Sequence, residues 1–250
     1  MRVIVTGASS GIGEALARRY AREGVVLGLI SRRRVDPALP GEVVSYALDV
    51  NNERALTTAA QDFIQRYGPP DIVIANAGIA SGTDGAEIGD VAKLRKIVET
   101  NVVGLAATLA AFAPAMRSAG RGTLVGIASI AGFRGLAGSG AYCASKSAAI
   151  TWMESLRAEL YGSGVSVVCI CPGYIDTPMT RINRFRMPFL LSADEAARRI
   201  QRAIAAKRRL AIIPWQMALL SLLLRMMPGW LFDRLASRAP RKPRTSRFEL

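Results

Sequence analysis

A tyrosine and a lysine four positions apart form the clearest chemical pattern in the sequence. Tyr142 and Lys146 begin a stretch with apolar residues at helical spacing, so their side chains point from the same face of a helix. Ser129 follows an apolar run of strand length, 122–128, and the loop between Ser129 and Tyr142 contains four glycines that let it fold back. The sequence therefore predicts that a hydroxyl, a phenol and an ammonium group meet.

These three groups can perform acid–base chemistry at a substrate oxygen. A free tyrosine has a pKa of about 10 and is a poor catalyst at neutral pH. A neighbouring ammonium lowers that pKa, toward the pH at which a general acid works best. We therefore predict that Lys146 lowers the pKa of Tyr142 and that Ser129 hydrogen-bonds the substrate oxygen. A packed tyrosine and a solvated lysine are the alternative, and Tyr-x-x-x-Lys alone does not decide between them.

A second pattern opens the chain. The β-branched run 2–6 is followed by the turn Gly-Ala-Ser-Ser-Gly-Ile-Gly and a helical stretch, 14–23. A strand, a glycine turn and a helix start offer free backbone donors and a helix dipole to an anion. The sequence thus predicts a phosphate cradle formed by Gly7, Ser9, Ser10, Gly11, Ile12 and Gly13.

Further motifs follow in a fixed order, namely Asn76-Ala77-Gly78, Asn101 and Pro172-Gly173. Together with the turn Gly-x-x-x-Gly-x-Gly and the tyrosine–lysine pair, they closely resemble the short-chain dehydrogenase/reductase family over roughly residues 1–180. The resemblance implies a Rossmann-like, doubly wound α/β fold with a mainly parallel seven-stranded sheet and helices on both faces. It also implies catalysis by Asn101, Ser129, Tyr142 and Lys146, with the last two residues also contacting the cofactor.

The order of the predicted elements supports this fold independently. Strands expected at 2–6, 25–30, 43–48, 71–75, 122–128, 165–171 and 210–213 alternate with helices, including one long helix at 90–116. Such alternation predicts a parallel sheet with helices on both faces, and ligands then bind outside the carboxyl ends of the strands. Asn76, Ser129 and Pro172 all follow such ends.

Arginines follow the second predicted strand. An acidic residue at this point of a dinucleotide fold binds the ribose diol, whereas an arginine accepts a 2′-phosphate. The sequence has Ser31-Arg32-Arg33-Arg34 there and no acidic residue. We therefore expect Arg32 or Arg33 to select NADP(H) as the cofactor, the alternative being a solvated basic turn.

The resemblance implies roles for the other cofactor residues. Asp49 and Val50 would contact the adenine, although Asp49 could equally be only the cap of the helix beginning near Asn52. The small residues of the Asn76-Ala77-Gly78 motif would let the backbone approach the cofactor. A segment after strand 165–171 would line the nicotinamide, through Pro172, Gly173, Ile175 and Thr177.

Asn101 lies in the predicted long helix, and Ala75 ends the predicted strand 71–75. In the family this asparagine helps to bind a water that links the catalytic lysine to solvent; the alternative is a local backbone hydrogen bond. Ala75 stands where the family more often has a further asparagine. We expect this departure to be tolerated.

Composition excludes several classes. The chain has 250 residues, no histidine and a net charge of +14. The lack of histidine excludes a Ser-His triad and a His-based metal site, and Cys143, Cys169 and Cys171 have neither metal-like spacing nor an even number. We expect no metal and, because no nucleic-acid-binding motif accompanies the charge, no nucleic acid. Met1 leads directly into the first strand, so no signal segment is expected and the predicted location is cytoplasmic.

We expect one domain with two parts, a dinucleotide-binding and catalytic part at 1–214 and an apolar helical extension with a basic tail at 215–250. Residues 215–224 are apolar nearly all round but too short to span a bilayer, which takes about 20 residues. A second apolar face follows around Trp230, and then an arginine-rich tail, expected to be disordered, that includes Arg241, Lys242, Arg244 and Arg247. The extension either caps the substrate pocket or a subunit interface, or anchors the protein peripherally on anionic lipid.

The predicted function is that of an NADP(H)-dependent oxidoreductase that interconverts a carbonyl and an alcohol. Apolar residues in 178–191, the family's substrate lid, suggest an apolar small-molecule substrate, although core packing of the lid accounts for them as well. The resemblance implies a homodimer or homotetramer that pairs the helices near 101–116 and after Tyr142. The alternatives are a lipid-surface protein and a non-catalytic NADP-binding sensor or scaffold, which should have lost a catalytic position.

Overall fold

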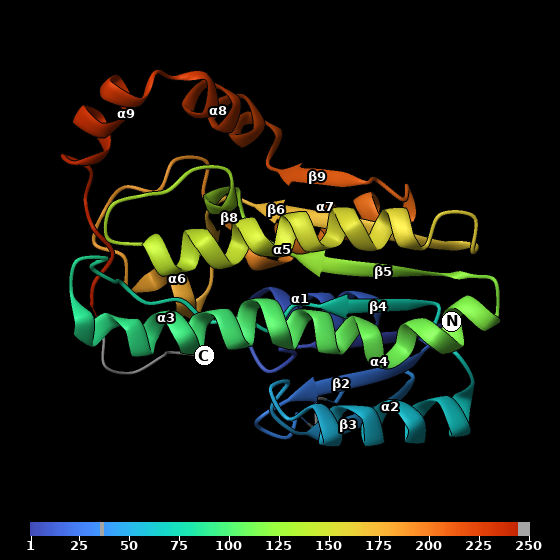
Figure 1. Cartoon of the computed structure of the whole chain (residues 1–250). Coiled ribbons are helices and arrows are strands. Elements are labelled where there is room, and N and C mark those ends of the chain that lie inside the picture. Colours follow the sequence, from blue (N-terminus) through green and yellow to red (C-terminus); the bar gives the residue numbers. More distant parts are fainter. Residues whose placement is uncertain (36–37, 245–250) are drawn as a thin grey trace.

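A parallel sheet of seven strands runs through the middle of the molecule (Figure 1). The computed structural model describes residues 1–35 and 38–244. The strand order is β3-β2-β1-β4-β5-β6-β9, and every neighbouring pair is parallel. The strands are β1 (Arg2–Thr6), β2 (Val26–Ser31), β3 (Glu42–Ala47), β4 (Ile72–Ala75), β5 (Gly122–Ile127), β6 (Val165–Pro172) and β9 (Leu210–Ile213). The predicted fold is confirmed, with a sheet that is wholly rather than mainly parallel.

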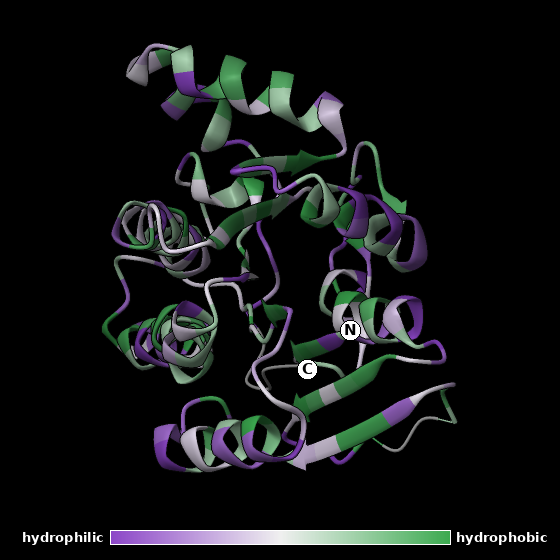
Figure 2. Ribbon diagram, turned by 90° about the vertical axis from the view of Figure 1, so that its right-hand side faces the viewer, coloured by the Kyte–Doolittle hydropathy of each residue, from purple (hydrophilic) through white to green (hydrophobic). Residues whose placement is uncertain are grey.

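Helices cover both faces of the sheet (Figure 2). Leu16 and Ile200 belong to one buried cluster, and Leu56, Phe112 and Met153 belong to another on the opposite face. One face is covered by α1 (Gly11–Tyr20) and α7 (Ala193–Ala205), and the other by α2 (Glu53–Tyr67), α4 (Gly104–Ser118) and α5 (Gly140–Glu159). Because the strand order reverses between β1 and β4, the carboxyl ends of these two strands flank the crevice where such folds bind ligands.

The predicted strands agree with the structure to within one residue at each end. The first helix differs more, since α1 begins at Gly11 rather than at Glu14 and ends at Tyr20. The last residues of the glycine turn already have helical geometry, so the turn and the helix start overlap. The loop 178–191 contains the short helix α6 (Pro178–Arg181), and a two-stranded sheet of β7 (Ile175–Asp176) and β8 (Leu191–Ser192) joins its ends.

The long helix predicted at 90–116 is interrupted. A 3-10 turn, η1 (Ile88–Asp90), leads into α3 (Val91–Val98), and a π-helical segment, η2 (Glu99–Val103), separates α3 from α4. The segment Ile88–Ser118 is long and apolar enough to cross a membrane by length and composition. Its apolar side chains have another explanation, because Leu109, Phe112 and Met116 are buried against the sheet.

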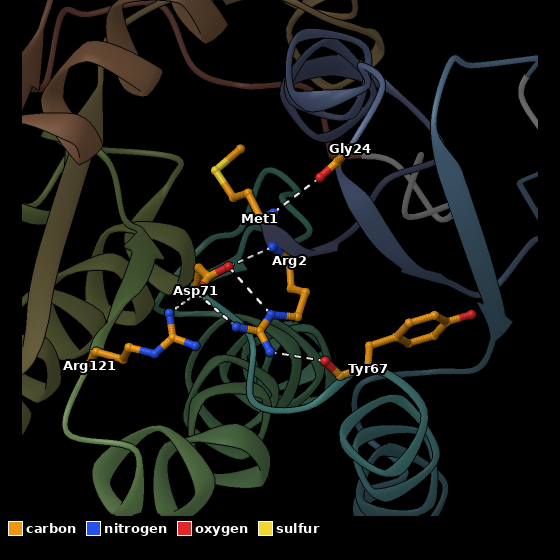
Figure 3. Close-up of polar contacts among 6 residues, drawn as sticks. All are labelled: Met1, Arg2, Gly24, Tyr67, Asp71 and Arg121. Atoms are coloured by element: carbon orange, nitrogen blue, oxygen red, sulfur yellow. Dashed lines mark hydrogen bonds and ion pairs between the residues drawn. The ribbon is translucent and has the colours of Figure 1, made fainter.

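A charged cluster ties together the amino ends of three strands (Figure 3). The carboxylate of Asp71, just before β4, accepts hydrogen bonds from the backbone N–H of Arg2 at 2.8 Å and from Nη2 of Arg2 at 3.2 Å. Nη1 of Arg121, next to β5, lies 3.1 Å from the same carboxylate. Burial opposes ionisation of Asp71, but the hydrogen bonds from Arg2 outweigh it and hold the pKa of Asp71 below its ordinary value. This cluster lies at the opposite edge of the sheet from the ligand crevice.

The C-terminal extension forms α8 (Trp215–Met226) and α9 (Gly229–Ala236), which lie above the carboxyl ends of β6 and β9 in Figure 1. Met217 is buried, and its side chain packs on Gly173. Nη1 of Arg134 donates to the carbonyl of Met227 at 3.0 Å, and its guanidinium lies 4.0 Å from the ring centre of Phe232. The inner side of the extension therefore packs on the region after β5 and β6.

The basic tail differs from the expectation of disorder over residues 241–244. The backbone N–H of Gly82 donates to the carbonyl of Pro243 at 3.1 Å, and Arg244 forms an ion pair with Asp90 at 2.9 Å. The sequence pattern could not show this, because the partners lie far away in the chain. Arg247 lies outside the described residues.

Candidate active site

A cavity of about 430 Å³ opens at the switch point between β1 and β4. It gathers nearly all the residues that the sequence predicted for cofactor and substrate. They come from the carboxyl ends of β1, β2, β3, β4, β5 and β6 and from the start of α5: Gly7, Ser9, Ser10, Gly11, Ile12, Arg32, Arg33, Asp49, Val50, Asn76, Ala77, Gly78, Ser129, Tyr142, Lys146, Pro172, Gly173, Ile175 and Thr177. Gly13 and Asn101 do not line the cavity and support it from behind.

The glycine turn after β1 requires its glycines. Gly7 and Gly11 have φ values of +66° and +58°, a region that residues with a side chain rarely adopt. A Cβ on Gly13 would collide with the carbonyl oxygen of Gly7 and lie 2.6 Å from Nδ2 of Asn76. The turn thus presents free backbone N–H groups at the N-terminus of α1, which suits an anion such as a phosphate.

Thr6, which the sequence analysis did not single out, connects this turn to β4. Its Oγ1 accepts hydrogen bonds from the backbone N–H groups of Asn76 at 3.0 Å and Ala77 at 3.1 Å. In return, Nδ2 of Asn76 donates to the carbonyl of Thr6 at 3.0 Å. Thr6 is fully buried. A polar residue at the end of an otherwise apolar first strand is the sequence feature that could have identified it. Asn76 thereby holds the two strand ends together beside the cavity.

The arginine turn lies at the far end of the cavity. Arg32 and Arg33 line it at the carboxyl end of β2, and the hydroxyl of Ser31 donates to the carbonyl of Arg33 at 2.5 Å. Asp49 also lines the cavity, and its carboxylate accepts from the backbone N–H of Asn51 at 3.0 Å. The alternative that Asp49 caps the following helix is wrong, because Asn52 caps α2 by accepting from Ala55 at 3.0 Å.

Asn101 is buried in the π-helical segment. Its Oδ1 accepts from the backbone N–H of Ile79 at 2.8 Å, and its Nδ2 donates to the carbonyl of Ile79 and to Oγ of Ser145, both at 3.0 Å. These bonds reach across the chain, which differs from the local backbone bond weighed as the alternative. A Cβ on Gly78 would lie 3.1 Å from Oδ1 of Asn101 and 3.6 Å from Nζ of Lys146. Asn101 and Lys146 therefore approach the same glycine at the end of β4.

Ser129, Tyr142 and Lys146 meet as predicted. Oγ of Ser129 accepts from the backbone N–H of Ala131 at 3.1 Å and donates to the carbonyl of Pro172 at 3.4 Å. Nζ of Lys146 donates to the carbonyl of Ile127 at 2.8 Å and lies 5.7 Å from the ring centre of Tyr142. The hydroxyl, the phenol and the ammonium thus face the cavity from the ends of β5 and the start of α5.

The electrostatics of this group differ from the expectation. Burial raises the pKa of Tyr142 to about 12, and the nearby hydroxyl of Ser129 only partly opposes the shift. Burial lowers the pKa of Lys146 to about 8, against smaller opposing effects of Cys171 and Cys169. The predicted lowering of the tyrosine pKa by Lys146 is therefore not found in this structure, because burial dominates and the ammonium bonds the carbonyl of Ile127. Tyr142 is held as a neutral phenol, able to donate a proton.

Several cavity residues could not be identified from motifs. Nδ2 of Asn51 donates to Oγ1 of Thr100 at 3.2 Å, which joins the loop after β3 to the π-helical segment. Ser31, Leu48, Ile127 and Ala128 could have been found from their places at or next to predicted strand ends, whereas the other residues depend on tertiary contacts. The further lining residues are Ser31, Leu48, Asn51, Ile79, Lys96, Thr100, Ile127, Ala128, Pro178, Met179 and Thr180. Within residues 1–35 and 38–244, no group of three or more acidic or cysteine side chains could hold a metal ion.

Comparisons with known proteins agree with this geometry. The sequence profile of the short chain dehydrogenase family matches residues 1–186. The chain is 41% identical over 243 residues to an uncharacterized oxidoreductase of Myxococcus xanthus, covering 94% of this chain and 96% of that one. It is 31% identical over 223 residues to the ketoacyl reductase HetN of Nostoc, covering 84% and 77% of the two chains. The crystal structure of levodione reductase shares the fold, with a TM-score of 0.75 at 24% identity over 87% of this chain and 97% of that one. The chain therefore belongs to the short-chain dehydrogenase/reductase family, whose members are oxidoreductases that use NAD(P).

Proposed function

We propose that this protein is an NADP(H)-dependent oxidoreductase that interconverts a carbonyl and an alcohol on a small, largely apolar substrate. The observation that carries the proposal is a single cavity that joins a glycine turn at a helix start, two arginines and the group Ser129, Tyr142 and Lys146. The name of the ketoacyl reductase HetN, a relative at 31% identity, points to the same reaction class.

The cofactor would lie along the crevice. The turn Gly7–Gly13 would bind its pyrophosphate through backbone N–H groups, and Arg32 with Arg33 would bind the 2′-phosphate that distinguishes NADP(H) from NAD(H). Asp49 and Val50 would contact the adenine. The segment Pro172, Gly173, Ile175 and Thr177 would line the nicotinamide.

The bound nicotinamide would supply or accept the hydride at the substrate carbon. Tyr142 would donate the proton to the carbonyl oxygen or remove it from the alcohol, and Ser129 would hold that oxygen by a hydrogen bond. Lys146 would hold the nicotinamide ribose. Asn101 would support a proton relay from Lys146 to solvent, and its observed bonds keep Ile79 and the end of β4 in place for this.

NADPH oxidation provides the test. Wild-type protein should oxidise NADPH with carbonyl substrates of increasing chain length, followed at the nicotinamide absorbance band. Tyr142→Phe should lose on the order of 10²–10⁴-fold in kcat, the worth of a general acid, while NADPH still binds, as measured by its fluorescence. A variant that retains the wild-type kcat would disprove the role of Tyr142. Binding of NADPH without turnover of any carbonyl by the wild type would favour the sensor or scaffold alternative.

We also propose two interactions of the whole protein. The chain would form a homodimer or homotetramer through α4 and α5, because Trp152 on α5 is 45% exposed. The outer side of α8 and α9 would contact anionic lipid peripherally, since large apolar side chains there are exposed. Much of the ribbon of these two helices, at the top of Figure 2, has the colour of hydrophobic residues. These side chains, each more than half exposed, are Trp215, Leu219, Leu222, Leu223, Met226, Trp230 and Leu235. The protein would then be cytoplasmic and partly membrane-associated.

A further inference from the structure

The C-terminal segment 240–244, here called the strap, crosses the two loops next to Tyr142. Figure 1 shows the red tail descending from α9 past the carboxyl edge of the sheet to the start of α3. The strap bonds to the loop after β4, where the N–H of Gly82 donates to the carbonyl of Pro243 at 3.1 Å. It also packs on the loop after β5, where a Cβ on Gly138 would lie 2.8 Å from Cβ of Arg241. These two loops are themselves joined by the N–H of Thr83, which donates to the carbonyl of Gly138 at 3.0 Å.

Two arginines anchor the strap on acidic residues. Arg244 forms an ion pair with Asp90 at 2.9 Å, and Arg241 lies 3.8 Å from Asp84. The Asp90 side chain is only 5% exposed, and it also pairs with Lys93 at 2.9 Å. Hydrogen bonds from the backbone of Asp84 and from Lys93 lower the pKa of Asp90, so its carboxylate stays ionised. The strap is thus held at both sides of Lys242.

Lys242 is the cation of the strap that faces the catalytic group. Its Nζ lies 5.8 Å from the ring centre of Tyr142, close to the 5.7 Å of Lys146. Among residues 1–35 and 38–244, no carboxylate or carbonyl is paired with this ammonium, and its contact with the Tyr142 ring is the interaction observed. Burial lowers the pKa of Lys242 to about 8. A half-buried ammonium without a counter-ion is costly, and a bound anion would remove that cost.

We propose that the strap borders the substrate site at Tyr142, next to the residues that line the cavity, and that Lys242 binds an anionic group of the substrate, a carboxylate or a phosphate, beside Tyr142. The inference rests on the proposed carbonyl–alcohol chemistry and narrows its substrate class to carbonyl compounds with an acidic group a few bonds from the reacting carbon. The rest of the substrate would be apolar, because Met179 lines the cavity and Tyr174 packs edge to face on Phe185 of the lid. Lys242 is then a specificity residue, whereas Lys146 serves the cofactor and the proton transfer.

A binding experiment tests the anion site without turnover. The full chain is titrated calorimetrically with decanoate, decyl phosphate and the neutral decanamide. Decanoate or decyl phosphate should bind more tightly than decanamide by on the order of ten- to a hundred-fold, the worth of a hydrogen bond to a charged group. The comparison of the two anions identifies the preferred acidic group. Lys242→Met should abolish the preference over decanamide, and Lys242→Arg should keep most of it.

Two glycine variants of one loop separate the strap from the lysine itself. A Cβ at Gly82 would lie 2.6 Å from the carbonyl oxygen of Pro243, so Gly82→Ala should displace the strap and reduce the anion preference. A Cβ at Gly85 would meet nothing within 4 Å, so Gly85→Ala is the matched control and should keep the preference.

A kinetic comparison links the site to the reaction. With NADPH, the ratio of kcat/KM for a γ-keto fatty acid to that for its methyl ester should fall by on the order of ten- to a hundred-fold in Lys242→Met. An unchanged ratio in this variant would overturn the proposal, even where the ketones are turned over. Faster turnover of both compounds by Lys242→Met and Gly82→Ala would also overturn it, since the strap would then be a plug. If no carbonyl is turned over at all, the proposed function fails, and the calorimetric titration still decides whether Lys242 binds anions.

Discussion

Asn101→Ala tests whether the buried asparagine holds the end of β4. The variant removes the three hydrogen bonds to the backbone N–H of Ile79, its carbonyl and Oγ of Ser145. Ile79 is 2% exposed, so both of its backbone groups would stay buried without a partner. Oγ of Ser145 would keep its bond to the carbonyl of Tyr142 at 2.8 Å. Each unsatisfied buried group costs about 1–3 kcal/mol, so the two backbone groups of Ile79 predict a loss of about 2–6 kcal/mol in the free energy of unfolding.

Urea unfolding followed by circular dichroism measures this loss. Ser145→Ala is the matched control, because it removes only one partner of Asn101 and leaves both bonds to Ile79. We expect it to cost about 1 kcal/mol, the net worth of a typical hydrogen bond. A loss below about 1 kcal/mol in Asn101→Ala would refute the reasoning, since it would mean that water or a backbone shift satisfies Ile79.

Four further predictions concern the cofactor, pH, assembly and lipid contact. Arg32→Ala should weaken NADPH binding by on the order of ten- to a hundred-fold but leave NADH binding nearly unchanged, with the double variant of Arg32 and Arg33 as the stronger test; equal losses for both cofactors in a fluorescence titration would contradict the 2′-phosphate role. Burial lowers the pKa of Lys146 to about 8 from its ordinary value of 10.5, so the native state releases this proton before the unfolded state does. The free energy of unfolding should therefore increase by roughly 2–3 kcal/mol between pH 8 and 10 because of this group. Urea unfolding at several pH values tests this, and a free energy of unfolding that increases as steeply in Lys146→Met as in the wild type would argue against it. Light scattering at micromolar concentration should show a dimer or tetramer that Trp152→Arg shifts to smaller species, whereas a monomeric wild type would rule out the interface. The full chain should float with anionic vesicles at low salt and Leu223→Glu should float less; a wild type that stays at the bottom of the gradient would exclude the lipid contact.

The motifs predicted the catalytic group because their chemistry depends on local positions. Ser129 follows the end of β5, and Tyr142 and Lys146 share one face of α5. In a parallel α/β fold, strand ends meet at one edge of the sheet, so the order of the motifs was enough to bring them together. The same reasoning placed Arg32 and Arg33 in the cavity.

The sequence did not predict the distances between these side chains or how deeply they are buried. The pattern indicated that a lysine near a tyrosine lowers its pKa, yet burial raises the pKa of Tyr142 to about 12. Whether the pKa of Tyr142 is lowered or raised depends on the solvation of the phenol and on the hydrogen bond of Lys146 to the carbonyl of Ile127. Both are properties of the packed chain rather than of a spacing.

The sequence by itself determined the family, the alternation of strands and helices along the chain and the candidate reacting side chains, because these follow from local patterns. Only the tertiary structure decided how distant segments meet. It places the π-helical turn that lets Asn101 reach Ile79, and it brings Lys242 of the strap to the ring of Tyr142. A contact between residues about a hundred positions apart leaves no periodic signal in the chain, because it arises from packing of whole elements rather than from propensity within one.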